Sequence, residues 1–154
     1  LIPLSSEIRH AKAYVRLMNQ RFGQSIRFMY HLAPGLSHHL IVKTILQPLV
    51  ENSIKHGFGV DSPGIPISTP AIEVIITAEE DELVININDN GSGFEPSELD
   101  ELLKKSSTAK GGHVGILNVY QRLTAYYGAE KVYISFSSIP YYCNVISIRI
   151  PLGS

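Results

Sequence analysis

Three polar stretches of the sequence combine residue types that can bind an anion and a metal ion. Residues 49–57 end an amphipathic helical pattern and carry an asparagine, a lysine and a histidine at its rim. Residues 89–93 read Asp-Asn-Gly-Ser-Gly and close a predicted strand, and residues 111–115 read Gly-Gly-His-Val-Gly and open a predicted helix. The chemistry that each stretch could support depends on where its polar groups point.

The first stretch places Asn52 at the edge of a buried helical stripe. At 100° per residue, Asn52 and His56 lie one turn apart on the same flank, with Lys55 beside them. The Asn52 carboxamide oxygen suits Mg²⁺, a hard cation that prefers oxygen ligands, and Lys55 and His56 could contact phosphates or a sugar. The alternative, favoured for this stretch alone, is a helix end with a solvated polar rim.

The second stretch turns a carboxylate inward. Asp89 is in phase with the apolar residues of its strand, and an inward carboxylate needs a partner. The exocyclic amine of adenine is a suitable donor, and Gly91 and Gly93 let the backbone approach a flat ring closely. The alternative is a tight turn in which Asp89 caps a neighbouring backbone group, because Asp-Asn-Gly is also a common hairpin sequence.

The third stretch is rich in glycine and precedes a helix. Glycines allow backbone amides to approach an anion, and a helix N-terminus favours negative charge. The alternative is an ordinary flexible loop, because such stretches are weak signals alone. Together, the three stretches predict one nucleotide pocket.

Composition limits the classes of protein that the chain can belong to. The 154 residues fit one domain, with 44% hydrophobic and 18% charged residues, which excludes a disordered chain. The net charge of −1 gives no basic field for nucleic acid, so no nucleic-acid partner is expected. The lone Cys143 excludes an internal disulfide framework, and no apolar run reaches transmembrane length. The chain begins without methionine, so we expect it to be a piece of a longer protein.

The elements that must position these residues follow from periodicity. Apolar spacings of three and four predict helices over about 5–22, 40–56, 97–105 and 115–127, with Ser5 and Ser6 as caps of the first. Pro48 should kink or restart the second helix. Alternation predicts strands over about 26–32, 72–78, 82–89, 132–136 and 146–150. This order predicts an α/β fold (α+β), a two-layer α/β sandwich with a mixed sheet of about five strands and helices on one face.

The three stretches, in this order, resemble the ATP-binding domain of sensor histidine kinases of the LytS/YesM type. Residues 46–57 are similar to the asparagine box, 89–94 to the first glycine box, and 115–123 to the second box with its helix. That domain has the Bergerat fold, shared with DNA gyrase and mismatch-repair ATPases. Residues 7–22 also resemble the helix that joins the dimerisation domain to the kinase core. The resemblance implies a linker helix over 1–23 and an ATP-binding catalytic domain over 24–154.

The resemblance also implies roles for individual residues. Asn52 would hold Mg²⁺, Asp89 would read adenine, and 95–112 would form a lid over the phosphates. Glu51 or Lys55 would assist transfer. The residues implied to bind ATP are Asn52, His56, Asp89, Gly91, Gly93, Phe94, Gly112, His113, Val114, Gly115 and Ile116.

The implied protein is a two-component kinase that transfers the γ-phosphate of Mg-ATP to a histidine outside this chain. Its implied partners are a dimerisation domain of the same protein and a response regulator, in a membrane-anchored bacterial homodimer with this domain in the cytoplasm. Two features depart from the family. His113 stands where many relatives have glycine, and Cys143-Asn144 stands where they often have Gly-Thr. The alternatives are therefore a degenerate module that only binds nucleotide or docks to partners, or a gyrase-type ATPase. The second is disfavoured by Pro48, which occupies the position of the general-base glutamate in those relatives.

Overall fold

A mixed five-stranded sheet forms one layer of the fold, as described by the computed structural model over residues 1–58, 69–105 and 113–153. The strand order is β2-β4-β5-β7-β6. Only β2 and β4 are parallel, and the other neighbours are antiparallel. The strands are β2 (Arg27–Leu32), β4 (Ala71–Glu79), β5 (Glu82–Asp89), β6 (Tyr133–Ile139) and β7 (Cys143–Pro151).

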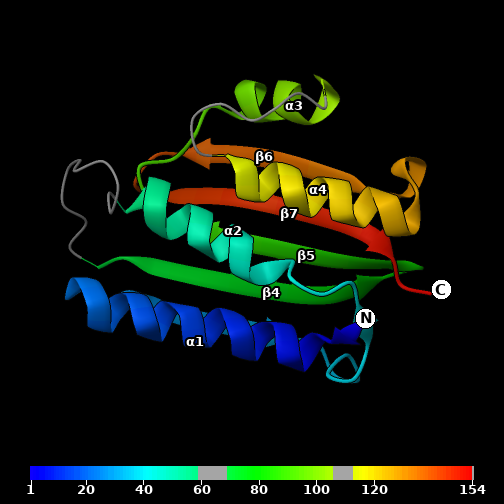
Figure 1. Ribbon diagram of the computed structural model, residues 1–154, viewed down its shortest axis with the longest axis horizontal. Helices are drawn as coiled ribbons and strands as arrows, with labels where there is room; N and C mark the ends of the chain where they lie inside the picture. Colours follow the sequence, from blue (N-terminus) through cyan, green and yellow to red (C-terminus); the bar gives the residue numbers. More distant parts are fainter. Residues whose placement is uncertain (59–68, 106–112, 154) are drawn as a thin grey trace.

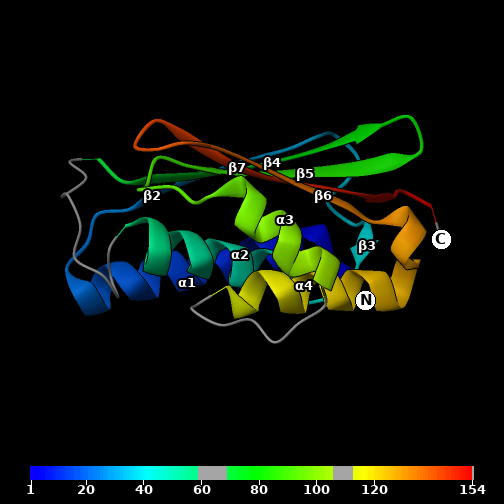
Figure 2. The same ribbon diagram turned by 90° about the horizontal axis from the view of Figure 1, so that it is seen from above.

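Helices make the second layer on one face of this sheet (Figures 1 and 2). Helices α1, α2 and α4 run beside one another along the strands, whereas α3 lies over the β6 edge. A pair of two-residue strands, β1 (Ile2–Pro3) and β3 (Leu40–Ile41), forms a second small sheet. The helices are α1 (Leu4–Phe22), α2 (Leu46–Asn52), the π-helix η1 (Ser53–Gly57), α3 (Pro96–Lys105), α4 (Val114–Tyr127) and the short 3₁₀-helix η2 (Ala129–Lys131). The predicted two-layer α/β sandwich is confirmed.

The core lies between the two layers because alternate residues of the strands point toward the helices. In register, Val74 faces Ile87 and Ile85 faces Ile148, and all four are buried. This alternation is the pattern expected of a sheet with one covered face. At the end of β5 the same alternation turns Asp89 inward, between Ile72 and Asn144 on the neighbouring strands. The strand pattern therefore brings a carboxylate to the end of the core.

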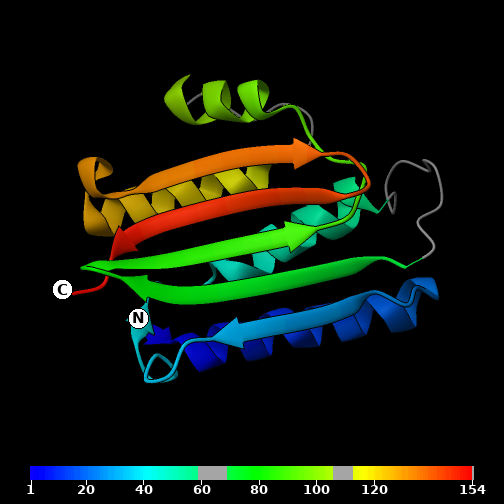
Figure 3. The same cartoon turned by 180° about the vertical axis from the view of Figure 1, so that it is seen from behind.

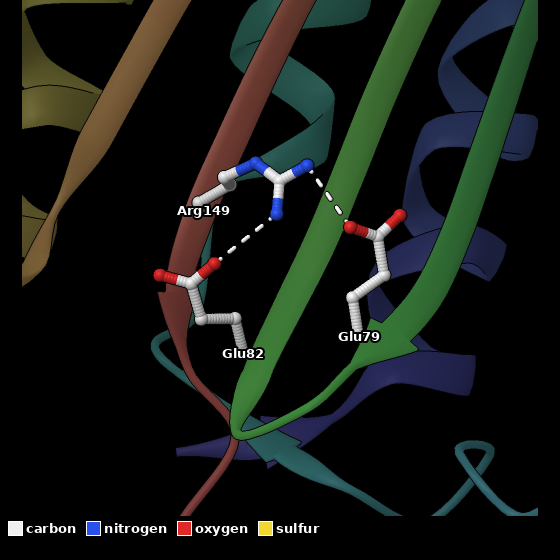
Figure 4. Close-up of polar contacts among 3 residues, drawn as sticks. All are labelled: Glu79, Glu82 and Arg149. Atoms are coloured by element: carbon white, nitrogen blue, oxygen red, sulfur yellow. Dashed lines mark hydrogen bonds and ion pairs between the residues drawn. The ribbon is translucent and has the colours of Figure 1, made fainter.

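The opposite face of the sheet carries no helix in the described part of the chain (Figure 3). Arg149 of β7 spans this face, with its guanidinium nitrogens 3.0 Å from Glu79 and 3.1 Å from Glu82 (Figure 4). The two glutamates flank the β4–β5 turn and raise the pKa of Arg149 through hydrogen bonds, Glu82 more than Glu79. These contacts tie β7 to the hairpin on the face away from the helices.

The predicted start of the second helix is wrong. Residues 40–41 pair as β3, and α2 begins only at Leu46 after a turn in which Thr44 has φ +65°. Pro48 therefore sits in the first turn of α2, where backbone N–H groups have no intrahelical partner, so the helix starts just before it and continues through it. The apolar pattern misled the prediction because strand, turn and helix each contribute residues to one core.

Two smaller expectations about α1 and α4 are also wrong. Ser5 and Ser6 lie inside α1, which follows Pro3 and has no side-chain cap. The helical spacing of Tyr126 from Ile116, Val119 and Leu123 predicts that it is buried in α4, but it is 52% exposed, and Leu117 is buried instead. By contrast, Gly23 ends α1 in the left-handed conformation with φ +64°, as its position after Phe22 predicts. Within the described ranges, no helix has the length and apolarity to span a membrane.

Candidate nucleotide site

The candidate site begins with the helix that carries the asparagine. Asn52 is the last residue of α2 and is buried, and the chain continues as the π-helix η1. Each backbone hydrogen bond of a π-helix spans one more residue than that of an α-helix, and such turns often occur at functional sites. Helix η1 brings Ser53, His56 and Gly57 to the wall of the same cavity as Asn52.

Asp89 forms the inner wall of this cavity and is held by three donors. Its Oδ2 accepts from the Ser53 hydroxyl at 2.7 Å. Its Oδ1 accepts from the Gly91 amide at 2.9 Å and from the Asn144 side-chain amide at 3.0 Å. The bond to Gly91 is the backbone cap that a turn requires, so the two sequence interpretations of Asp89 are compatible. The three bonds orient the carboxylate toward the cavity.

The two glycine-bearing turns touch each other without side chains between them. A Cβ placed on Gly91 would lie 2.6 Å from backbone atoms of Gly57, a distance that real Cβ atoms do not reach. The Ser92 amide donates to the Gly57 carbonyl at 2.8 Å, and the Ser92 hydroxyl donates to the His56 carbonyl at 3.0 Å. Glycine at position 91 is therefore required by backbone contact. This contact joins the end of η1 to the turn after β5.

His113 closes the cavity from the opposite side. Its Nδ1 lies 3.3 Å from the Asn52 Oδ1, and its ring centroid is 5.3 Å from that of His56. An amide oxygen only accepts, so Nδ1 carries the proton in this contact. Burial lowers the pKa of His113, the neighbouring His56 lowers it further, and Glu98 opposes both. His113 is thus favoured as a neutral imidazole that covers the oxygen expected to bind a metal ion.

The cavity between Asp89 and His113 has a volume of about 10 Å³. That is room for about one water molecule, so an adenine ring can enter only if His113 and its neighbours move. Its lining combines backbone turns, one carboxylate, two imidazoles and an aromatic ring: Asn52, Ser53, His56, Gly57, Asp89, Gly93, Phe94 and His113.

A wider hollow of about 340 Å³ lies on the other side of Asn52 and His56. Glu51 and Lys55 stand on its rim and form an ion pair at 2.7 Å. Val114 and Gly115 line it from the start of α4, where the first backbone N–H groups of the helix have no intrahelical acceptor. The hollow therefore combines a lysine with a helix N-terminus, an arrangement that suits phosphate groups.

The structure brings most of the predicted site residues together, on either side of Asn52. Ile116 is an exception, because its side chain is fully buried in the core and only its backbone could face a ligand. Gly112 and part of the predicted lid (95–112) lie outside the described residues, and the described part of the lid contains α3. The roles assigned to these residues remain predictions.

Sequence reasoning missed Asn144 as a supporting residue. Asn144 is 1% exposed, donates to Asp89 Oδ1 and to the Gly91 carbonyl at 3.0 Å each, and accepts from the Ser138 hydroxyl at 2.6 Å. In the antiparallel pairing of β5 and β7, Asn144 lies opposite Asp89. A prediction of this strand register could have identified it. Asn144 therefore supports Asp89 and the Gly91 turn directly, although it stands where the sequence departs from the family that it resembles.

The few oxygen ligands of the site suit a metal ion that is held mainly by the phosphates of a bound substrate. The described residues contain no cluster of three or more His, Cys, Asp or Glu side chains able to hold a metal. Mg²⁺ commonly takes one or two protein oxygens and completes its shell with substrate phosphates and water. Asn52, between the cavity and the hollow, can supply one such oxygen.

Comparison with known proteins identifies the family and supports the fold. The family model of histidine kinase-, DNA gyrase B- and HSP90-like ATPases matches residues 38–154. The sensor protein LytS of Oceanobacillus iheyensis is 34% identical over 134 residues, which are 85% of this chain and 22% of that protein. The LytS of Bacillus subtilis is 29% identical over 99% of this chain and 25% of its own length. The chain thus spans about a quarter or less of these relatives. The solved catalytic domain of histidine kinase ThkA shares the fold, with a TM-score of 0.66 at 13% identity over 97% of this chain and 93% of that one.

Proposed function

Because the chain belongs to the family of histidine kinase-, DNA gyrase B- and HSP90-like ATPases, we propose that it is the catalytic domain of a sensor histidine kinase. In this role it binds Mg-ATP and delivers the γ-phosphate to a histidine outside residues 1–154. Residues 1–23 would link it to a dimerisation domain, and 24–154 would bind ATP. The whole protein would be a membrane-anchored homodimer that places this domain in the cytoplasm and phosphorylates a response regulator. The similarity to the sensor proteins LytS supports the assignment to a sensor kinase.

The observation that carries the proposal is the partially used carboxylate of Asp89. A carboxylate offers about four acceptor positions. Among the described residues three donors reach Asp89, two at Oδ1 and only the Ser53 hydroxyl at Oδ2. One position on Oδ2 remains for a donor in the cavity, and the adenine amine supplies a donor of this kind. The carboxylate is held in advance, so binding does not have to order it.

The other residues then divide between metal and phosphates. Asn52 would bind Mg²⁺ after releasing His113, while His56, Lys55 and the start of α4 at Gly115 would contact the phosphate chain. Mg²⁺ would neutralise charge that develops on the transferred phosphoryl group. Glu51 would hold Lys55 in place through their ion pair. Catalysis of phosphoryl transfer depends mostly on positioning and charge neutralisation, so none of these residues has to form a covalent intermediate.

Neither alternative function is favoured by a specific contact. Pro48 has no titratable group, so it cannot activate water for a gyrase-type ATPase. The degenerate-module alternative rested partly on Cys143-Asn144, but Asn144 supports Asp89 directly. His113 covers Asn52 through one contact of 3.3 Å, which a bound metal can replace.

Titration calorimetry with a non-hydrolysable ATP analogue and Mg²⁺ tests the proposal. Asp89→Asn keeps the shape of the side chain but replaces one acceptor oxygen by a donor. Loss of a charged hydrogen bond should weaken binding about tenfold or more. Asp81→Asn is the matched control, since it makes the same change in the turn between β4 and β5 and should bind as wild type does. Absence of wild-type binding at millimolar nucleotide would refute the proposal.

A further inference from the structure

Glu7 is the only buried charged side chain among the described residues, and the proposed site does not use it. It lies in the first turn of α1 and is 1% exposed. A carboxylate can be buried at tolerable cost only if its oxygens are bound by strong donors. The donors that bind the Glu7 carboxylate therefore indicate its structural role.

Glu7 caps α2, a helix that starts almost forty residues later. Its two carboxylate oxygens accept the backbone N–H groups of Thr44, Ile45 (3.0 Å) and Leu46 (2.8 Å). The first N–H groups of a helix have no intrahelical acceptor, and Ile45 supplies no side-chain cap to α2. A negative charge at this end also favours the helix dipole. Glu7 thus replaces the missing local cap.

Arg122 of α4 binds the same turn from the other side. Its Nη1 donates to the Lys43 carbonyl at 3.0 Å and to the Thr44 carbonyl at 3.5 Å. Thr44 has a φ of +65°, a conformation that non-glycine residues adopt only when their surroundings impose it. We call Glu7, the turn 43–46 and Arg122 the turn clamp. Through these side-chain hydrogen bonds the turn clamp joins α1, α2 and α4.

We propose that Glu7 and Arg122 are positioning residues for the nucleotide site, an inference that rests on the proposed function. Helix α2 runs from the turn clamp at Leu46 directly to Asn52. The start of α4 lies against α2, where the Pro48 carbonyl is 3.3 Å from the Cβ position of Gly115. The turn clamp therefore fixes Asn52 relative to the phosphate end of the site. It also bonds the site to α1, so a displacement of α1 is transmitted to Asn52.

The test separates affinity from stability in purified protein of residues 1–154. Glu7→Gln keeps the size of the side chain but turns an N–H₂ donor toward backbone N–H groups, and Arg122→Gln removes the donor to the turn carbonyls. The dissociation constant for a Mg²⁺-bound ATP analogue is measured by calorimetry well below each melting transition. We expect about fivefold weaker binding in each variant, within the range found for positioning effects through packed networks. The double variant should be less than additive, because both changes loosen one turn.

Ile8→Val is the matched control. It removes one buried methyl group from α1 next to Glu7 without touching the turn, so the melting temperature should fall while the dissociation constant stays at the wild-type value. Wild-type affinity in Arg122→Gln and in any folded Glu7→Gln would overturn the inference. If Glu7→Gln does not fold, Arg122→Gln decides alone. Absence of binding in the wild type would instead overturn the proposed function, so the two failures are distinguishable.

Discussion

Replacing Asn144 by alanine should destabilise the domain strongly, although Asn144 belongs to none of the three polar stretches. The side chain makes three hydrogen bonds in a fully buried position, to Asp89, Gly91 and Ser138. Each partner retains another bond after the substitution. Asp89 Oδ1 keeps the Gly91 amide, the Gly91 carbonyl keeps the Tyr141 amide, and the Ser138 hydroxyl keeps the Phe94 amide.

The magnitude follows from these three bonds. Two are neutral and contribute about 1 kcal/mol each, and the bond to the carboxylate contributes about 1.5 kcal/mol at the lower end for charged groups. Because every partner stays partly bonded, we add no further desolvation cost and expect a loss of about 3.5 kcal/mol in the free energy of unfolding. Asp89 would also lose a positioning contact, so nucleotide affinity should fall in the folded variant.

Urea denaturation followed by circular dichroism measures the first effect, and calorimetry measures the second. Asn88→Ala is the matched control, because Asn88 also belongs to the β5–β7 pair and its buried amide oxygen has no partner among the described residues. The control should change the unfolding free energy by about 0.5 kcal/mol or less, as expected where no network is broken. An Asn144→Ala variant within about 1 kcal/mol of wild type would refute the hydrogen-bond reasoning.

Three further substitutions or conditions test other contacts of the site. Gly91→Ala should unfold the domain or lower its melting temperature by several degrees, because its Cβ would lie 2.6 Å from the Gly57 backbone; a normal melting curve would contradict this contact. His113→Gly should tighten binding of the Mg²⁺-bound analogue, because Asn52 Oδ1 is released from its 3.3 Å contact; weaker binding would instead mean that the imidazole contacts the nucleotide. The pKa of His113 is lowered below 6.5 in the folded state by burial and by His56, so the unfolded chain binds more protons between that lowered pKa and 6.5. Stability should therefore fall as pH drops through this window and be constant above it, and His113→Gln should flatten urea-denaturation profiles recorded across that range.

The strands of the sheet could be predicted from sequence because their determinants are local. β-Branched residues alternate with polar ones in β4, β5 and β7, and one covered face is enough to explain that alternation. The inward direction of Asp89 follows from the same period. The prediction of one site from the three polar stretches rests on their complementary chemistry and on the family resemblance, because nothing local brings residues 52 and 113 together.

The start of α2 could not be predicted because its cap is not local. Leu40, Ile41 and Ile45 continue the apolar pattern of the helix without belonging to it, and the turn at Thr44 has no glycine to mark it. The missing signal is Glu7, whose carboxylate lies 37 to 39 residues away in the chain. The sequence does not show that the glutamate in α1 is buried or which groups it binds, because most glutamates in helices are exposed to solvent.

Asp89 caps the turn with one carboxylate oxygen and faces the cavity with the other, so the two interpretations of Asp-Asn-Gly do not exclude each other. A turn needs only one side-chain acceptor for the Gly91 amide, and one oxygen would suffice. Here Oδ1 takes that amide together with Asn144, whereas Oδ2 faces Ser53 and the cavity. The turn therefore occupies one oxygen and leaves the other for a ligand. Because the same network that folds the turn also fixes the direction of Oδ2, a variant that keeps the turn bond but reorients the carboxylate should lose nucleotide affinity without losing the fold. Ser53→Ala meets this condition, since it removes the only protein donor to Oδ2 among the described residues, and calorimetry beside a melting curve would separate the two effects.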